Sequence, residues 1–373
     1  MIWKTTRFGL YLGRGWIGIA IVLILAGCAK QSTKPNVLLI TLDTLRADAL
    51  GCYGNTKVQT ATLDRIAKEG IVFEDAMCQI PATLTSHTAM MTGRNPKTTG
   101  VRFRTGRVSV HEETLAERFQ TRGYDTAAFL GSYVLAPEFG LNQGFDRYEM
   151  GSMVRQNRKI AEERRAEETI QQTIAFLDDP RPRPFFIWLH LYDAHSPYDP
   201  PAPFSTLYDP HYTGTIRGSV AEITRLNASH GEGLNEAGRH HLRALYEGEV
   251  TYMDRQIATL LAKLEEKRIL DDTVLAIIAD HGENLGEGGR FFHGDDLYQP
   301  SIHIPFLIRY PKRIAAGLRI SQSVQSIDLF PTLLELADIP MISGVEGTSL
   351  VPLFHDSNQV PGYSSKPGYL ETE

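Results

Sequence analysis

Two apolar segments of this chain are each followed closely by side chains of the types that bind metal ions in proteins. Asp43 comes after the run 36–41 (NVLLIT), and Asp280 and His281 come directly after the run 273–279 (TVLAIIA). Runs of this kind predict buried strands, and open parallel sheets bind ligands at the carboxyl ends of their strands. We therefore expect the three side chains to surround one divalent cation. Two carboxylates and an imidazole suit Zn²⁺ or Mn²⁺ better than Mg²⁺ or Ca²⁺.

The two strand ends differ in how strongly they indicate a metal site. A single carboxylate at a strand end also serves as a helix cap or a loop acceptor, so Asp43 alone is weak support for a metal site. The sequence Asp280-His281-Gly282-Glu283 is stronger, because a turn has no need of adjacent hard and borderline ligands.

Thr83 is the candidate nucleophile near this metal. It follows Pro81 and precedes a predicted helix over 84–92, and local sequence by itself favours a role as the N-cap of that helix. A helix N-terminus also offers free N–H groups and a partial positive charge to an anion. A metal bound to the Thr83 hydroxyl would lower its pKa and make an alkoxide accessible. The sequence leaves both roles open.

The elements that must position these residues alternate along the chain. Strands are expected over 36–41, 125–130, 185–191, 273–279 and 304–309, and helices over 60–69, 84–92, 113–121, 159–177, 239–267 and 327–337. Apolar strands alternating with helices predict an α/β fold, with a mostly parallel central sheet and helices on both faces. The segment Pro201–Gly233 has little periodicity and predicts a long excursion near the site. Thr60 is a plausible cap for the first helix, and Gly70 a plausible stop.

Composition limits the class of protein. The chain has 373 residues with 42% apolar and 22% charged residues, which is typical of a soluble globular protein with one large or two ordinary domains. Its formal net charge of −6 gives no reason to expect nucleic acid as a partner.

The N-terminal segment predicts export and a lipid anchor. A basic start and an apolar run precede Leu25-Ala26-Gly27-Cys28, which resembles a bacterial lipobox. We expect residues 1–27 to be a lipoprotein signal peptide, Cys28 to be lipidated, and residues 28–35 to form a tether. An uncleaved anchor or a secretory signal cut nearby are the alternatives. Ala29 after the cysteine favours the outer membrane of a Gram-negative cell envelope, with the protein facing the periplasm or the exterior.

Two further cysteines leave their state open. Cys52 and Cys78 would meet an oxidising compartment in an exported protein. A disulfide and two free thiols are both consistent with the sequence, because the geometry that a bridge needs cannot be read from it.

The stretch from Thr83 to Arg94 resembles the signature of the sulfatase family, within the alkaline phosphatase superfamily. There a Cys or Ser stands two residues before a Pro and four before an Arg, upstream of Thr-Gly-Arg, and is oxidised to formylglycine. Here Thr83, Thr85 and His87 occupy the three positions, and Thr92-Gly93-Arg94 follows. The resemblance runs from about Pro35 onward. It implies a sulfatase-like catalytic domain over 36–373, with the smaller C-terminal subdomain of such proteins missing or truncated.

The resemblance also implies roles for residues outside the metal cluster. His195, in Ala194-His195-Ser196-Pro197-Tyr198, would contact the non-bridging oxygens of the ester, and His293 would protonate the leaving oxygen. His87 and Arg94 flank the nucleophile, and are expected either to support it or to pack.

The sequence departs from the family in a consistent way. Thr44 stands where many sulfatases have a second Asp, and Gly131-Ser132-Tyr133-Val134 replaces their Gly-Lys-Trp-His. Asp43, Asp280 and His281 with a Thr nucleophile resemble the Thr-dependent phosphotransferases of the superfamily.

The function implied is that of a metal-dependent hydrolase of small-molecule or glycan sulfuric esters, or of closely related phosphoesters. Thr83 would be the nucleophile, and water or an acceptor alcohol would release its ester. One alternative is a phosphoester hydrolase or phosphotransferase of the alkaline phosphatase superfamily. Another is a non-catalytic, surface-anchored binding protein. The replacement of the family's Lys and Arg favours this alternative, and the retention of Asp43, Asp280 and His281 argues against it.

Overall fold

The computed structural model describes residues 1–2, 34–102, 106–151, 163–354 and 370. The chain divides into residues 1–33 and 34–373, and the fold described below belongs to the second part. Residues 3–27 of the predicted signal peptide, Cys28 and most of the tether lie outside the described residues. Residues 159–162 of one predicted helix and nearly all of the chain after 354 also lie outside them. Among the described residues, none of the helices has the length and apolar character needed to span a bilayer.

A mostly parallel sheet of eight strands forms the centre of the fold. In sheet order the strands are β12 (Leu318–Ile320), β2 (Ile71–Phe73), β11 (Phe306–Arg309), β7 (Thr273–Ala279), β1 (Asn36–Leu42), β6 (Phe185–Leu191), β4 (Asp125–Leu130) and β5 (Arg147–Glu149). β11 alone among these runs antiparallel to its neighbours β7 and β2. The predicted mostly parallel sheet is therefore confirmed.

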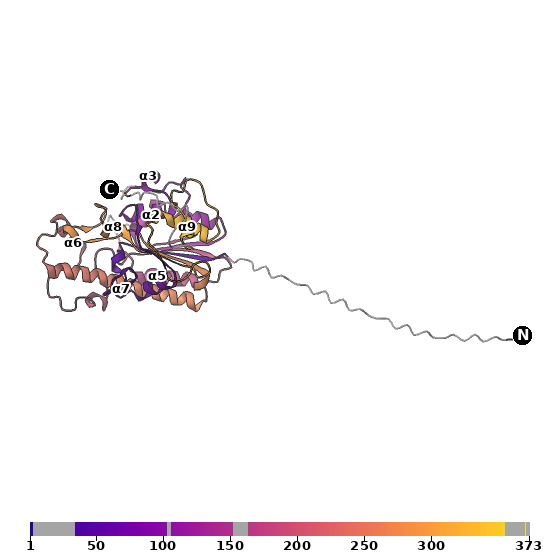
Figure 1. Cartoon of the computed structure of the whole chain (residues 1–373), viewed down its shortest axis with the longest axis horizontal. Coiled ribbons are helices and arrows are strands. Elements are labelled where there is room, and N and C mark those ends of the chain that lie inside the picture. The colour runs from indigo at the N-terminus through magenta and orange to yellow at the C-terminus, as the bar shows by residue number, and fades with distance from the viewer. Residues whose placement is uncertain (3–33, 103–105, 152–162, 355–369, 371–373) are drawn as a thin grey trace. The chain divides into compact units, whose positions relative to one another are not determined.

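Helices cover both faces of this sheet (Figure 1). One face carries α2 (Thr83–Thr92), α4 (Leu115–Gln120) and α9 (Leu329–Leu336). The other carries α1 (Ala61–Glu69), α5 (Ala166–Asp178) and α7 (Glu236–Glu266). The shorter elements are α3 (Pro96–Thr99), α6 (Val220–Ala228), α8 (Gln299–Ile302), the three-stranded sheet of β10 (His303–Ile304), β3 (Ala76–Met77) and β13 (Val324–Gln325), and the hairpin of β8 (Asn284–Leu285) and β9 (Phe291–Phe292).

The central strands are buried on both faces, which is why they read as continuous apolar runs. Every residue of β6 and β7 is buried, and so is β1 after Asn36. Each buried Val, Leu or Ile side chain contributes about 1.5–3 kcal/mol relative to an exposed one. The strand ends that carry the candidate site therefore project from a rigid platform.

Three local expectations need correction. Thr60 precedes α1 but makes no capping hydrogen bond, because the Asp254 carboxylate of α7 accepts from the N–H groups of Thr62 and Leu63 instead. The predicted strand 304–309 is divided between β10 and β11, since Pro305 has no N–H to donate. The excursion 201–233 contains the regular helix α6.

The fold decides whether Cys52 and Cys78 form a disulfide. Cys78 is buried, Cys52 is half-buried, and both are free thiols. The disulfide alternative is therefore wrong for this structure.

Candidate active site

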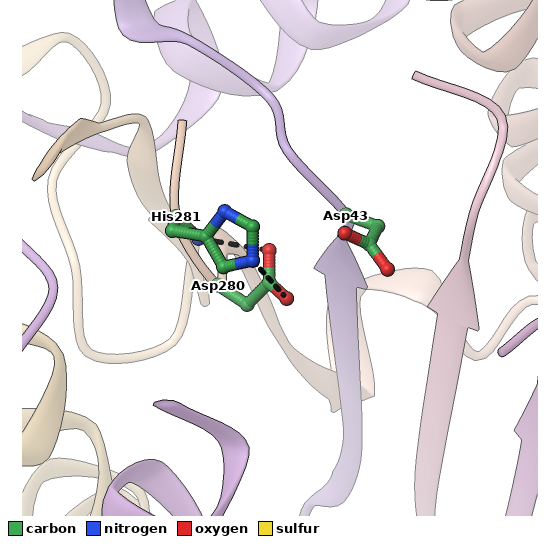
Figure 2. A group of neighbouring side chains, drawn as sticks. All are labelled: Asp43, Asp280 and His281. Carbon is green, nitrogen blue, oxygen red and sulfur yellow. Dashed lines mark hydrogen bonds and ion pairs between the residues drawn. The ribbon is translucent and has the colours of Figure 1, made fainter. Parts of the chain in front are cut away.

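Asp43, Asp280 and His281 converge at one edge of the sheet (Figure 2). β1 and β7 are parallel neighbours, with Leu42 opposite Ala279, so the residues that follow lie side by side. One ligand atom from each of the three lies within 4.8 Å of the others. All three residues are fully buried. The structure thus brings together the three residues that the sequence singled out as metal ligands.

The donor atoms of this cluster fit a divalent cation. Neither oxygen of Asp43 accepts a hydrogen bond of good geometry, and nor does Oδ2 of Asp280. Burial raises the pKa of both carboxyls, and for Asp43 the charge of Asp280 raises it further. Buried carboxylate oxygens without partners are costly, and a cation between them would remove that cost.

His281 presents the form of imidazole that metals bind. Its Nδ1–H donates to the carbonyl of Gly282 at 2.9 Å, so Nε2 carries the free lone pair. Burial, with a smaller contribution from His293, lowers the pKa of His281 to about 3. The neutral ring, oriented by a backbone carbonyl, is the usual arrangement of a metal-binding histidine.

Thr83 lies at the first position of α2, and its hydroxyl faces this cluster. Ala82 is the N-cap residue, and no side chain caps the helix, so the expectation that Thr83 caps α2 is wrong. Its Oγ1 lies 3.3 Å from Nε2 of His281. The residue is 7% exposed, so it is largely shielded from bulk water.

His87 lies one helical turn after Thr83 and supports it from behind. Its Nδ1 lies 2.7 Å from the Thr83 carbonyl and 3.6 Å from Oδ2 of Asp280. Arg94 follows the end of α2, ten residues long, and is therefore roughly 15 Å from Thr83 at about 1.5 Å per residue. It pairs with Glu112 at 2.7 Å, which fits the packing alternative for this residue.

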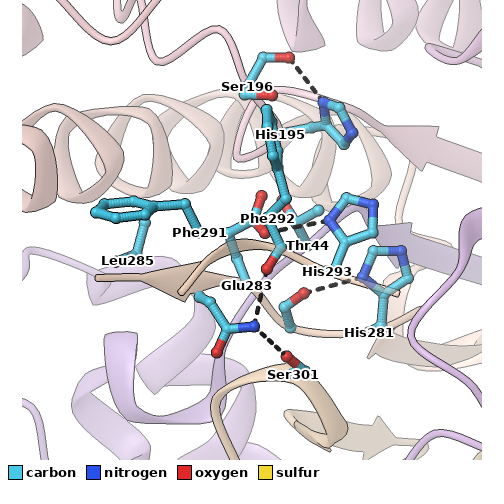
Figure 3. A network of polar contacts seen from close by, with 12 residues as sticks. Thr44, His195, Ser196, His281, Glu283, Leu285, Phe291, Phe292, His293 and Ser301 are labelled. Carbon is cyan, nitrogen blue, oxygen red and sulfur yellow. Dashed lines mark hydrogen bonds and ion pairs between the residues drawn. The ribbon is translucent and has the colours of Figure 1, made fainter. Parts of the chain in front are cut away.

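His195 and His293 lie next to His281 in a row of three rings (Figure 3), and both are half-buried. The His293 ring lies 4.2 Å from that of His281 and 5.3 Å from that of His195, between ring centres. The Nδ1 of His195 donates to the Ser196 carbonyl at 2.7 Å and also contacts the Tyr192 hydroxyl at 2.5 Å. Burial and the neighbouring His293 lower the pKa of His195 to about 3, and a bound anion would oppose that shift.

Glu283 belongs to the site, although sequence analysis assigned it no role. Its Oε1 lies 3.1 Å from Nδ1 of His293, and the residue is fully buried. Burial raises the pKa of Glu283 to about 7. Its contact leaves Nε2 of His293 as the outer nitrogen, which is what a proton donor needs. The signal that could have found it is the last residue of the Asp-His-Gly-Glu motif itself.

Comparison with known proteins identifies a family that this chain resembles over most of its length. The family model for sulfatases matches residues 35–339. An arylsulfatase of Clostridium perfringens is 27% identical over 87% of this chain and 79% of its own length.

Solved structures share the fold. A protein in complex with its substrate D-glucosamine-2-N,6-O-disulfate aligns with a TM-score of 0.72 and 23% identity, over 89% of this chain and 82% of that one. The phosphonate monoester hydrolase from Silicibacter pomeroyi aligns with a TM-score of 0.72 and 23% identity, over 88% and 78%. The predicted α/β fold of the sulfatase and alkaline phosphatase group is confirmed.

Proposed function

Because the chain belongs to the sulfatase family, we propose that it cleaves sulfuric esters with Thr83 as the nucleophile. One divalent cation would be held by Asp43, Asp280 and His281. The observation that carries this proposal is the position of Thr83 Oγ1, 3.3 Å from His281 Nε2. Beside it lie three carboxylate oxygens of Asp43 and Asp280 that accept no hydrogen bond of good geometry.

The chemistry divides among the residues of the site. A bound cation would supply Lewis acidity, which favours the deprotonated hydroxyl and neutralises charge on the ester oxygens. Thr83 would lose its proton to solvent, and its Oγ would then form a bond to sulfur while the bond from sulfur to the leaving oxygen breaks. His293, oriented by Glu283, gives its Nε2 proton to that oxygen. His195 would contact the non-bridging oxygens once the bound anion restores the proton on its Nε2.

Release of the Thr83 ester needs an external nucleophile. A formylglycine hydrate expels sulfate with its second hydroxyl, and Thr83 has no second hydroxyl to use. Water or an acceptor alcohol must therefore attack the covalent ester. Phosphoester or phosphonate hydrolysis, or phosphotransfer, is the second candidate, because such enzymes routinely cleave a covalent ester by external attack. The structural match to a phosphonate monoester hydrolase favours keeping it.

We propose small-molecule or glycan esters as substrates. The arylsulfatase relative supports an aryl ester, and the structure solved with a sulfated glucosamine supports a glycan. We also propose that Cys28 carries a lipid in a bacterial cell envelope, which the lipobox-like Leu25-Ala26-Gly27-Cys28 supports.

The test is a substrate panel on protein reconstituted with Mn²⁺ or Zn²⁺. Aryl sulfate, phosphate monoester, phosphodiester and phosphonate esters are assayed in parallel, with the Thr83→Ala variant purified in the same way to reveal contaminating activity. The proposal expects the largest kcat/KM on a sulfate ester. A preference for a phosphorus ester would select the second candidate. Absence of turnover on every substrate would favour the non-catalytic binding protein.

A further inference from the structure

The hydroxyl of Thr41 contacts three buried side chains just behind the candidate metal cluster. Its Oγ1 accepts from the indole N–H of Trp188 at 2.9 Å. It also lies 3.0 Å from Nδ1 of His190 and 3.0 Å from Nε2 of His87. All four residues are buried, with exposed fractions of 0%. Solvent therefore cannot substitute for any of these contacts.

The arrangement follows from the sheet register. Thr41 of β1 lies opposite His190 of β6, and neighbouring residues in parallel strands point to the same face. Trp188 lies two residues before His190, so it shares this face. His87 comes from α2, and its ring meets that of His190 edge to face at 4.8 Å between ring centres.

The three contacts use the full capacity of the hydroxyl. A threonine hydroxyl has one proton to donate and two lone pairs to accept with. Trp188 can only donate, so the hydroxyl donates to one imidazole and accepts from the other. Thr41 thereby fixes the orientation of His87 and His190 together. The ring nitrogen that faces Thr41 accepts a hydrogen bond in one imidazole and donates one in the other.

The outer nitrogens of the same two rings reach the catalytic cluster. Nδ1 of His87 contacts the Thr83 carbonyl at 2.7 Å and lies 3.6 Å from Oδ2 of Asp280. Nε2 of His190 lies 3.3 Å from Oδ2 of Asp43 without a hydrogen bond between them, so the ring restrains this carboxylate by packing and leaves its oxygen available to a cation. One hydroxyl thus lies behind both carboxylates and behind the first turn of α2.

We propose that Thr41 is a positioning residue of the metal centre. Through His87 and His190 it holds Asp280 and Asp43 at the separation that a cation requires. This inference rests on the proposed function, because it concerns the same cation. The competing role is packing alone, in which Thr41 stabilises the fold and leaves cation binding unchanged.

The experiment compares cation affinity with the stability of the metal-free protein. Affinity for Mn²⁺ is measured by competition with a fluorescent chelator, and thermal unfolding is measured without metal, for wild type and for Thr41→Val, Thr41→Cys and Thr41→Ser. Val keeps the shape and removes all three hydrogen bonds. Cys weakens them, and Ser retains the hydroxyl. Thr173→Val is the matched control, because Thr173 is fully buried and bonds only to the Thr169 carbonyl of its own helix.

We expect Thr41→Val to weaken Mn²⁺ binding by about 10-fold, the lower end of the loss for an outer hydrogen bond made directly to a metal ligand, because Thr41 acts through two intervening rings. Thr41→Ser should bind within about threefold of wild type, Thr41→Cys should lie between Ser and Val, and Thr173→Val should be unchanged. If Val proves too unstable to assay, the order of Ser and Cys still tests the inference.

Two results would overturn it. Unchanged Mn²⁺ affinity in the Thr41 variants, with a lowered unfolding temperature, would assign Thr41 to packing and leave the proposed function standing. A wild-type protein that binds no cation would overturn the metal centre and this inference with it.

Discussion

The hydroxyl of Thr83 and the Nε2 atom of His281 lie 3.3 Å apart, although 198 positions separate the two residues in sequence. Thr83 begins a helix, and His281 follows the strand β7, which pairs with β1 in the middle of the sheet. The contact puts a hydroxyl beside a neutral imidazole whose other nitrogen is held by the Gly282 carbonyl. The proposed nucleophile requires this contact, and a threonine that only capped a helix would not need it.

The first prediction concerns the cation. Asp280→Asn keeps the side-chain volume and removes one negative charge from a fully buried cluster, so we expect Mn²⁺ or Zn²⁺ binding and turnover to fall by at least about 100-fold. Elemental analysis after reconstitution measures the bound metal. Asp271→Asn is the control, because Asp271 lies before β7 and its side chain is 74% exposed. Full metal occupancy in Asp280→Asn would contradict the assignment.

The second prediction concerns the proton donor. His293→Ala should lower turnover by about 10²–10⁴-fold for an alkyl ester, whose leaving oxygen needs a proton. A nitrophenyl ester, whose leaving group departs as an anion, should lose far less. Glu283→Gln should give the same pattern at smaller size, because it disturbs the contact that orients the His293 ring. His240→Ala, with a 64% exposed side chain, serves as the control. Equal losses on both esters would show that His293 has another role.

The third prediction is a pH dependence of stability from a buried carboxyl beside the loop that carries His195. Glu249 accepts from the Asp199 N–H, and burial, with the charge of Asp193, raises the pKa of Glu249 to about 9. The fold therefore favours the protonated carboxyl. Its contribution is complete below the unfolded pKa near 4.5 and is lost as pH rises toward about 9.

Glu249→Gln should flatten that loss. We expect its unfolding temperature to exceed that of wild type by about 2 °C or more at pH 8, with a smaller difference or none at pH 5. Glu265→Gln, a surface change on the same helix whose side chain is 45% exposed, should leave the pH profile unaltered. Parallel profiles for wild type and Glu249→Gln would mean that Glu249 does not become charged in this range.

The fourth prediction concerns the anchor. Cys28→Ala removes the thiol of the lipobox-like sequence, so we expect the protein to leave the membrane fraction and to carry no lipid. Mass spectrometry of the mature N-terminus of the wild type checks the same point. A wild-type N-terminus at another residue, or an unmodified Cys28, would disprove the lipoprotein.

The sequence was sufficient for the parts of the fold that local pattern controls. β4, β6 and β7 have the predicted bounds, because apolar runs of this length have few alternatives to a buried strand. The parallel sheet then dictates that Asp43 and Asp280 meet, since they follow paired residues of adjacent strands. For this reason the meeting of these two carboxylates could be predicted without coordinates.

The parts that sequence could not provide depend on contacts between distant segments. Asp254 caps α1 from another helix, and nothing near Thr60 reveals this. Glu283 behind His293 and Thr41 between two histidines are ordinary residues of their elements. Their roles depend on ring orientation and strand register, and neither can be read from the residues next to them in the sequence.

The most direct test of the central claim is the turnover of Thr83→Ala on the best substrate of the panel, with Thr83→Ser beside it. An activated covalent nucleophile has no substitute nearby, so we expect Ala to lose at least about a thousandfold in kcat and Ser to keep a measurable part of the rate. Both variants should still bind the cation. Turnover of Thr83→Ala within about tenfold of wild type, equivalent to only about 1.4 kcal/mol of barrier, would contradict the account and leave Thr83 without a covalent role.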